Sequence, residues 1–468
     1  MDDLRLSLCE DNLTSGMTTS LKPSPIPTSE LIEALQEARK RTLELIEDLS
    51  DEQLMGPRLA IVNPLRWEIG HVAWFQEFWI LRHLGDLPSI LTGGDSLYDS
   101  ARVAHEGRWD LPLPTRAQTL AYMMQALDRV CDPDDRRKRD PIDDYDEKYF
   151  LHLVLFHEQM HAEAITYTRQ TLCYPPPGIE IAAERIRSGA AGVSGDAHIP
   201  GGKFSLGAVP GEPFVFDNEQ QPHEVEVKPF SISKTAMTNG EFAAFVEDGG
   251  YARRELWGEE GWKWNRNAGA EHPVYWQRES SGRWLRRDFD RWVELQDRVA
   301  LIHVNWYEAD AYCRWAGRRL PTEAEWEMAA SCEPSHDGHS VSDHKRRYPW
   351  GDGGPTADRA NLDWRERGCI EVDALPAGDS AFGCRQMIGN TWEWTSTPFG
   401  AYPGFVPGPY KEYSEPWFGD HKVLRGGCWA TRSSMIRSEY RNFYPPDRRD
   451  VWAGFRTCAL GDGSSQIA

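Results

Sequence analysis

The chain has 468 residues, 40% of them hydrophobic and 27% charged, a composition typical of a globular protein with two or three domains. Its formal net charge of −21 argues against binding a nucleic acid or an anionic membrane through bulk charge, since both are themselves negative. No apolar run reaches membrane-spanning length and no signal peptide is evident, so we expect a cytoplasmic protein. The nine cysteines are scattered without a CxxC pair, which predicts neither a disulfide framework nor a cysteine zinc site.

The first third of the chain carries helical periodicity after a polar lead. Residues 1–28 are polar and run into "SLKPSPIPTS", which predicts a flexible segment before the first helix. Apolar residues then recur at helical spacing in four stretches, at 29–50, 64–84, 115–131 and 146–172. The proline run "YPPPG" ends the last of them. Four long amphipathic helices predict an antiparallel four-helix bundle over residues 29–190.

The composition of the sequence changes after residue 190, where Gly, Pro and Trp become frequent. Short strands are predicted at 204–208, 223–233, 422–430 and 453–460, and short helices at 238–250 and 306–317. The pattern predicts an α+β domain with much irregular backbone over residues 191–462. The fold class is therefore two-domain, with an all-α bundle followed by an α+β domain.

The fourth predicted helix contains "HEQMH" at residues 157–161, which has the form H-E-x-x-H of zinc metalloproteases. Helix positions four apart differ by about 40° in azimuth, so His157 and His161 face the same way and can bind one metal. Glu158 lies about 100° from His157, and Glu163 lies about 200° from His161 and faces away. Two imidazoles on one face are only half of a metal site.

Three parts of the sequence are candidates for a third metal ligand. Ala164 and Tyr167 occupy the positions at which one class of zinc proteases has a glycine and a histidine. The helix ends too soon, in "TRQTLCYPPPG", to supply a downstream glutamate. His71, in "WEIGHVAWFQE" on the second helix, is the remaining candidate, because facing helices of a bundle can bring one His and an i,i+4 pair together. Imidazole suits Zn, Fe, Cu and Ni, so the spacing does not name the metal.

Several segments of the sequence resemble those of a known family. The segments "GHVAWFQEFWILR" and "HEQMHAE" resemble the helical metal-binding domain of the ergothioneine-type sulfoxide synthases. The segments "RLPTEAEWEMAA", "GNTWEWTSTP", "RGGCWATR" and "GFRTC" resemble the formylglycine-generating-enzyme-like domain of the same family. Each Trp and Gly motif alone is typical of a structural role. Their order behind a helical bundle is specific, and the resemblance covers about residues 29–460. It implies a DinB-like bundle, a C-type-lectin-like (FGE-sulfatase) domain and an active site between them.

The resemblance implies a non-haem iron(II) enzyme that uses O₂ to form a carbon–sulfur bond at C2 of the imidazole of hercynine (Nα-trimethylhistidine). His71, His157 and His161 match the iron ligands of the family. Three neutral ligands leave positions for three reactants and would pre-orient them. Tyr410 matches the tyrosine that donates a proton in the oxygen chemistry, and Tyr413 is its nearby rival.

Further positions match the family's substrate contacts. Asn442 is expected to be a polar contact of hercynine, and Phe443 and Tyr444 can offer aromatic faces to its quaternary ammonium. Met160 stands where the family often has a glutamine that touches the substrate imidazole, and Gln159 is shifted from that position by one residue.

The donor positions depart from enzymes that use γ-glutamylcysteine. Arg108 is kept, but His105 stands where a second donor-binding arginine occurs, and Tyr444 stands where an aspartate can occur. Because two charged contacts to a dipeptide are missing, we expect the selenoneine synthase branch, which uses a selenosugar. An ergothioneine sulfoxide synthase that uses γ-glutamylcysteine or cysteine is the alternative.

Two other classes of function are alternatives. Formylglycine generation uses a pair of copper-binding cysteines, but Thr431 and Ile436 occupy those positions and Cys428 takes the usual serine position. A non-catalytic lectin-like binding module remains an alternative, against which the three-histidine set argues. The protease reading lacks a third ligand, so we predict that Glu158 is not a general base.

Overall fold

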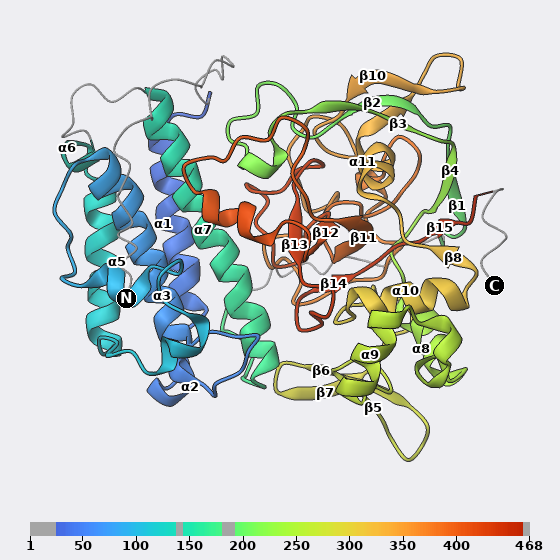
Figure 1. Cartoon of the computed structure of the whole chain (residues 1–468), viewed down its shortest axis with the longest axis horizontal. Coiled ribbons are helices and arrows are strands. Elements are labelled where there is room, and N and C mark those ends of the chain that lie inside the picture. Colours follow the sequence, from blue (N-terminus) through green and yellow to red (C-terminus); the bar gives the residue numbers. More distant parts are fainter. Residues whose placement is uncertain (1–24, 137–143, 180–191, 462–468) are drawn as a thin grey trace, which may run out of the picture.

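The computed structural model describes residues 25–136, 144–179 and 192–461, and Figure 1 shows the helices of the first part packed beside the mixed α and β structure of the second. Most of the predicted lead (residues 1–24) and the predicted domain boundary at residue 190 lie outside the described residues. Over the described ranges, no helix is both long and apolar enough to cross a membrane.

The N-terminal part is the predicted bundle. Its long helices are α1 (Thr28–Glu44), α3 (Leu65–Gln76), α5 (Arg116–Cys131) and α7 (Asp144–Thr171). Shorter helices are α2 (Asp51–Met55), α4 (Gly94–Tyr98), η2 (His105–Trp109) and α6 (Pro133–Arg136). Helix α1 packs against α7, and α3 packs against both α5 and α7. The periodicity of the sequence therefore identified the four elements that form the bundle.

The second long helix changes its hydrogen-bond pattern halfway along. Helix α3 continues directly into a π-helix, η1 (Glu77–Leu84), where the sequence predicted one continuous helix to residue 84. The buried carboxylate of Glu77 at this junction accepts hydrogen bonds from the Tyr122 hydroxyl (2.5 Å) and the Ile90 amide (3.1 Å). Apolar spacing does not distinguish a π-helix from an α-helix over two turns.

The C-terminal part contains short strands in several small sheets. One sheet has the order β1 (Asp196–Ile199), β4 (Phe230–Ser233), β15 (Cys458–Ala459), β8 (Arg318–Arg319). A second has the order β13 (Asn442–Tyr444), β12 (Lys422–Arg425), β11 (Trp392–Pro398), β14 (Ala453–Gly454). The remainder are β2 (Gly202–Leu206) with β3 (His223–Val227), β9 (Cys332–Pro334) with β10 (Val341–Lys345), and β5 (Trp276–Arg278), β6 (Trp284–Asp288) and β7 (Arg291–Glu294).

Four α-helices lie among these strands. They are α8 (Asn239–Glu247), α9 (Glu259–Ala268), α10 (Trp306–Trp315) and α11 (Glu323–Ser331). Helices α8 and α10 match the two predicted ones, whereas α9 and α11 were not predicted. The start of α11 had a signal in the sequence, because Thr322 and Glu325 form a capping box. The predicted strand 223–233 is split into β3 and β4 at Pro229, which has no amide hydrogen to donate.

Helix α7 belongs to both parts of the molecule. One continuous cluster of buried apolar side chains includes residues of the bundle and of the C-terminal domain. From the C-terminal domain, Trp392 donates its indole N–H to Glu163 (2.7 Å) and Trp452 donates to Thr166 (2.7 Å), both on α7. The face of α7 that does not pack into the bundle is thereby fixed against the second domain.

Candidate metal centre and substrate cavity

The three histidines predicted as ligands lie together. His71 is on α3, and His157 and His161 are one turn apart on α7. One nitrogen of each ring lies within 4.8 Å of those of the other two, and the Nε2 atoms of His71 and His157 are 3.2 Å apart. His71 and His157 are buried, while His161 is partly exposed. This geometry places three ligand-capable nitrogens around one point.

The surroundings favour neutral rings with nitrogen lone pairs towards the cluster. Nδ1 of His71 is 2.7 Å from the Tyr98 carbonyl oxygen, so it carries the hydrogen and Nε2 is free to bind. Burial holds the pKa values of His71 and His157 well below their ordinary range. The ring of His157 stacks on Phe75 with 3.6 Å between centroids. Neutral imidazole is the form that binds metals, so this donor set fits a divalent transition-metal ion.

Glu158 is occupied elsewhere. It is fully buried and accepts hydrogen bonds from Arg39 Nε (2.8 Å), Thr42 Oγ1 (2.9 Å) and Gln76 Nε2 (2.6 Å). These donors belong to α1 and α3, so the carboxylate points into the bundle. A carboxylate whose lone pairs are all taken by buried donors has no free position for a substrate proton. The geometry therefore agrees with the prediction that Glu158 is not a general base.

A cavity of about 710 Å³ opens beside the histidine cluster, between α7 and loops of the C-terminal domain. Of the ten predicted site residues, nine line it: Arg108, His157, Met160, His161, Tyr410, Tyr413, Asn442, Phe443 and Tyr444. The tenth, His71, lies behind this lining, with its ring stacked on Trp67 at 4.9 Å. The structure thus brings residues of both domains to one cavity of ligand size.

The two candidate tyrosines have different surroundings. The Tyr410 ring lies 4.9 Å from Phe75 and 6.2 Å from His157, and none of the described residues hydrogen-bonds its hydroxyl. The Tyr413 hydroxyl lies 3.2 Å from that of Tyr440 and 3.5 Å from the sulfur of Met160. Burial raises the pKa of both Tyr410 and Tyr413, so both are neutral phenols. Tyr410 is therefore the one with a free hydroxyl beside the metal cluster.

Strand β13 supplies an aromatic part of the wall. Its residues are Asn442, Phe443 and Tyr444, and all three line the cavity. Pairing with β12 fixes the backbone of this strand. Phe443 stacks on Phe399 at 3.9 Å, and its ring lies 5.4 Å from that of Tyr413. The packing fixes the orientation of these rings, so the wall presents rigid aromatic surface to a ligand.

Among the described residues that line the cavity, Arg108 is the one Arg or Lys side chain. Arg108 stacks on Trp67 at 3.8 Å and donates a hydrogen bond to Asn63 (2.6 Å). Burial lowers the pKa of Arg108 to about 10, so it remains charged at neutral pH. His105 instead contacts the Val62 carbonyl (2.7 Å) and is not among the residues of the cavity wall. Tyr444 lines the wall, and burial raises its pKa, so it adds no charge.

Glu163 also lines the cavity, although sequence reasoning assigned it no role. The azimuth predicted that Glu163 faces away from the ligand histidines, but it lines the same cavity as His157 and His161, where Trp392 (2.7 Å) and the Thr431 hydroxyl (2.5 Å) donate to it. The segment "HEQMHAE" contains Glu163, but its partners are 229 and 268 residues away in the sequence.

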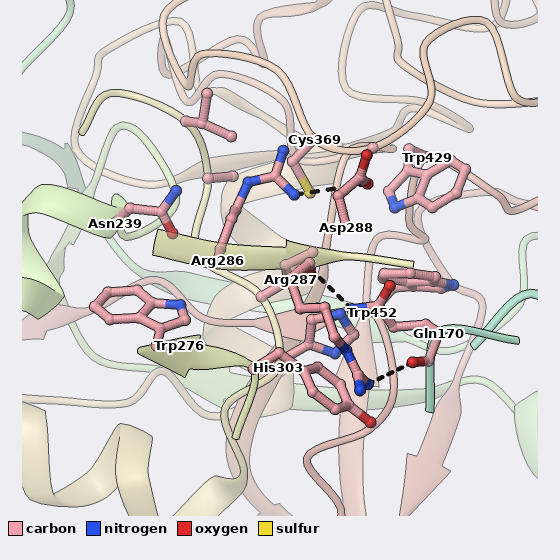
Figure 2. Close-up of a pocket in the computed structure, with 15 residues that line it drawn as sticks. Gln170, Asn239, Trp276, Arg286, Arg287, Asp288, His303, Cys369, Trp429 and Trp452 are labelled. Carbon is pink, nitrogen blue, oxygen red and sulfur yellow. Dashed lines mark hydrogen bonds and ion pairs between the residues drawn. The ribbon is translucent and has the colours of Figure 1, made fainter. Parts of the chain in front are cut away.

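A second, smaller cavity lies where the end of α7 meets strand β6 (Figure 2). Gln170 of α7 donates to the Arg287 carbonyl oxygen (3.0 Å) at its edge, and His303 and Cys369 also line it. Its volume is about 20 Å³, and a cavity of this size holds about one water molecule. It contains none of the predicted site residues, so the larger cavity is the candidate site.

Comparison with known proteins agrees with both halves of this description. Residues 34–165 match the DinB superfamily, and residues 187–459 match the sulfatase-modifying factor enzyme 1-like domain. The hercynine oxygenase of Mycolicibacterium thermoresistibile is 37% identical over 92% of this chain and 94% of its own length. That of Mycobacterium tuberculosis is 35% identical over 90% of this chain and 96% of its own length.

The formylglycine-generating enzyme of Streptomyces coelicolor is 32% identical, but it matches only 58% of this chain, along 92% of its own length. The two hercynine oxygenases, in contrast, extend over both domains. The chain therefore belongs to the hercynine oxygenase family and is an oxidative enzyme.

Proposed function

We propose that the protein joins a selenium or sulfur atom to C2 of the imidazole ring of hercynine, with iron(II) as cofactor and O₂ as oxidant. The observation that carries this proposal is a cavity with His157 and His161 on one side, converging with His71 behind them, and an aromatic wall on the other side. The names of the relatives support hercynine as the substrate.

The three histidines would hold the iron(II). A set of neutral imidazoles without a bound carboxylate leaves coordination positions open and suits iron among other metals. Iron(II) bound there would supply the electron transfer that lets O₂ oxidise the donor and the imidazole. In the sulfoxide form of the reaction, one oxygen atom stays on the chalcogen. The other leaves as water with the C2 proton and the donor's proton, which balances the four electrons accepted by O₂.

The wall of the C-terminal domain would orient hercynine. Phe443 and Tyr413 present aromatic faces, which attract a quaternary ammonium group. The side chain of Asn442 is a neutral hydrogen-bonding group suited to the carboxylate of hercynine. Met160 lies on α7 between the two ligand histidines in sequence, and it would contact the imidazole ring through its sulfur or methyl group.

Tyr410 would act as the proton donor. Its hydroxyl is neutral, free of hydrogen bonds to the described residues, and carried on a ring that contacts His157 and Phe75. A neutral phenol in this place can give a proton to oxygen during turnover and recover it from water.

The donor is proposed to be a selenosugar. A zwitterionic dipeptide needs charged partners, and charge-assisted hydrogen bonds contribute about 1.5–3 kcal/mol each. The wall has Arg108 and the acidic residues Glu163 and Glu412, but at the two positions predicted for further dipeptide contacts His105 lies outside the wall and Tyr444 is a neutral phenol. A sugar needs hydroxyl and aromatic contacts instead. Arg108 itself favours the second candidate, an ergothioneine-type sulfoxide synthase with γ-glutamylcysteine or cysteine as donor.

The test is anaerobic reconstitution with iron(II), followed by hercynine and each donor under O₂, with products identified by mass spectrometry. At saturating hercynine we expect kcat/KM to be highest for a 1-selenosugar, lower for γ-glutamylcysteine and for cysteine. A clear preference for γ-glutamylcysteine assigns the second candidate. If hercynine gives no product with any donor, the proposed reaction is wrong.

A further inference from the structure

Helix α3 carries a buried carboxylate one turn before its ligand histidine. Glu68 precedes His71 by three residues and is 1% exposed. Its Oε1 atom lies 2.9 Å from Nδ1 of His161, which is on α7. Helix α3 therefore provides one histidine of the cluster and the hydrogen-bond partner of another.

This contact determines which nitrogen of His161 can bind a metal. A carboxylate can only accept a hydrogen bond from a ring nitrogen, so Nδ1 of His161 must carry the hydrogen. Nε2 then keeps its lone pair for the metal. A neutral imidazole without such an acceptor distributes its hydrogen between both nitrogens, and its ring is freer to rotate. The hydrogen bond to a carboxylate also makes the ligand nitrogen more basic.

The three histidines are supported unequally. Nδ1 of His71 donates a hydrogen bond to the backbone carbonyl of Tyr98. Nδ1 of His157 has no hydrogen-bond partner among the described residues. Within those residues, only His161 meets a carboxylate. We propose that Glu68 is a positioning residue of the metal site, which fixes the tautomer and orientation of His161 and thereby raises the affinity for the metal. This inference rests on the proposed metal site, but not on the identity of either substrate.

The alternative role for Glu68 is in the donor pocket, because its carboxylate also favours the charged form of the nearby Arg108. In that role Glu68 would serve the donor pocket and leave metal binding unchanged. Metal affinity, measured without substrates, therefore separates the two roles.

The variants are Glu68→Met, which keeps the length of the side chain but accepts no strong hydrogen bond, and Glu68→Gln, which keeps an oxygen acceptor. Glu77 on the same continuous helix is a matched control, since it is also buried but bonds to Tyr122 and Ile90. The dissociation constant for iron(II) is measured anaerobically by competition with a chromophoric chelator. The visible spectrum of the cobalt(II)-loaded protein reports the coordination geometry.

We expect Glu68→Met to bind iron(II) about 10- to 100-fold more weakly, the range typical for loss of such a partner. Glu68→Gln should lose less iron(II) affinity, and the affinity of Glu77→Gln should match that of the wild type. The cobalt spectrum should change in Glu68→Met only. Wild-type affinity and spectrum in Glu68→Met would overturn the inference, and so would equal losses in the Glu68 and Glu77 variants.

The folded state of each variant is checked by circular dichroism and thermal unfolding. If Glu68→Met does not fold, the iron(II) affinity of Glu68→Gln decides, since an affinity identical to wild type would then contradict the positioning role. A wild-type protein that binds iron(II) but does not convert hercynine would reject the proposed function and leave this inference standing. A wild-type protein that binds no metal would reject both.

Discussion

The two sides of the cavity are built in different ways. The bundle side uses regular helices, on which His157 and His161 share a face because of helical geometry alone. Its buried carboxylate Glu158 is held by three hydrogen-bond donors from neighbouring helices. The wall from the C-terminal domain uses loops and the three-residue strand β13, and its side chains are fixed by ring packing such as that of Phe443 on Phe399.

This difference separates two tasks. A metal site needs ligand atoms placed within a few tenths of an ångström, which rigid helices provide. A site that must distinguish related substrates can change more easily in irregular backbone, where one residue alters shape or charge without disturbing a helix. We therefore expect substitutions on the bundle side to remove activity altogether and substitutions in the wall to redirect or slow it.

The largest effect is expected from His71→Ala. Loss of one of the three proposed ligands should reduce bound iron(II) to background and abolish oxygen-dependent turnover, while circular dichroism still reports a folded bundle. Metal content and oxygen consumption measure this. His105→Ala is the control, because His105 bonds to the Val62 carbonyl away from the cluster. Full activity of His71→Ala would show that the helical side is not the metal site.

Next in size is Tyr410→Phe. Positioned general acids contribute about 10²- to 10⁴-fold to rate, so kcat should fall within this range or the product should change. Hercynine binding should be unaffected, because only a hydroxyl is lost. The matched variant is Tyr413→Phe, whose hydroxyl contacts Met160 and Tyr440 instead. The reverse result, with Tyr413→Phe slow and Tyr410→Phe normal, would assign the proton to Tyr413.

A smaller effect is expected from Tyr444→Asp in the wall. A carboxylate there would give the ammonium group of γ-glutamylcysteine a charged partner, worth about 1.5–3 kcal/mol, or roughly 10- to 100-fold in kcat/KM. The kcat/KM for a selenosugar should fall or stay unchanged. Tyr444→Asn is the control for size without charge. If both variants change donor preference equally, charge at this position does not set specificity.

The smallest effect concerns a buried carboxylate behind the wall. Both oxygens of Glu439 lack hydrogen-bond partners among the described residues, its ion pair with Lys345 spans 3.7 Å, and burial raises its pKa to about 7. The unfolded chain titrates near 4.5. Between these values the folded state holds more protons, so this group destabilises the protein increasingly as pH rises towards 7.

Glu439→Gln should therefore raise the free energy of unfolding at pH 8 by on the order of 1–3 kcal/mol relative to wild type, with little difference at pH 4. The variant should accordingly unfold at a higher temperature at pH 8. Thermal scans at both pH values measure the gain. An equal gain at both pH values would mean that packing, and not ionisation, accounts for it. A loss at pH 8 would show that the ion pair with Lys345 stabilises the charged form.

The sequence predicted the two sides of the cavity to different degrees. Apolar periodicity identified the bundle helices, and spacing placed His157 and His161 on one face. His71 followed as a candidate from bundle geometry. The wall residues, such as Tyr410 and Asn442, followed only from the family resemblance, because loops carry no periodicity from which a position can be calculated. The supporting contacts of Glu68 and Glu163 were missed, since they join helices and domains that only the folded chain brings together.

The placement of Glu163 has a consequence for protein engineering. This carboxylate is encoded with the bundle, but Trp392 and Thr431, which donate to it, are encoded with the second domain. A chimaera that combined this bundle with a domain lacking those donors would bury an unsatisfied carboxylate, at a cost of about 1–3 kcal/mol or more. Recombination between relatives should therefore succeed only when these three positions are inherited as a set.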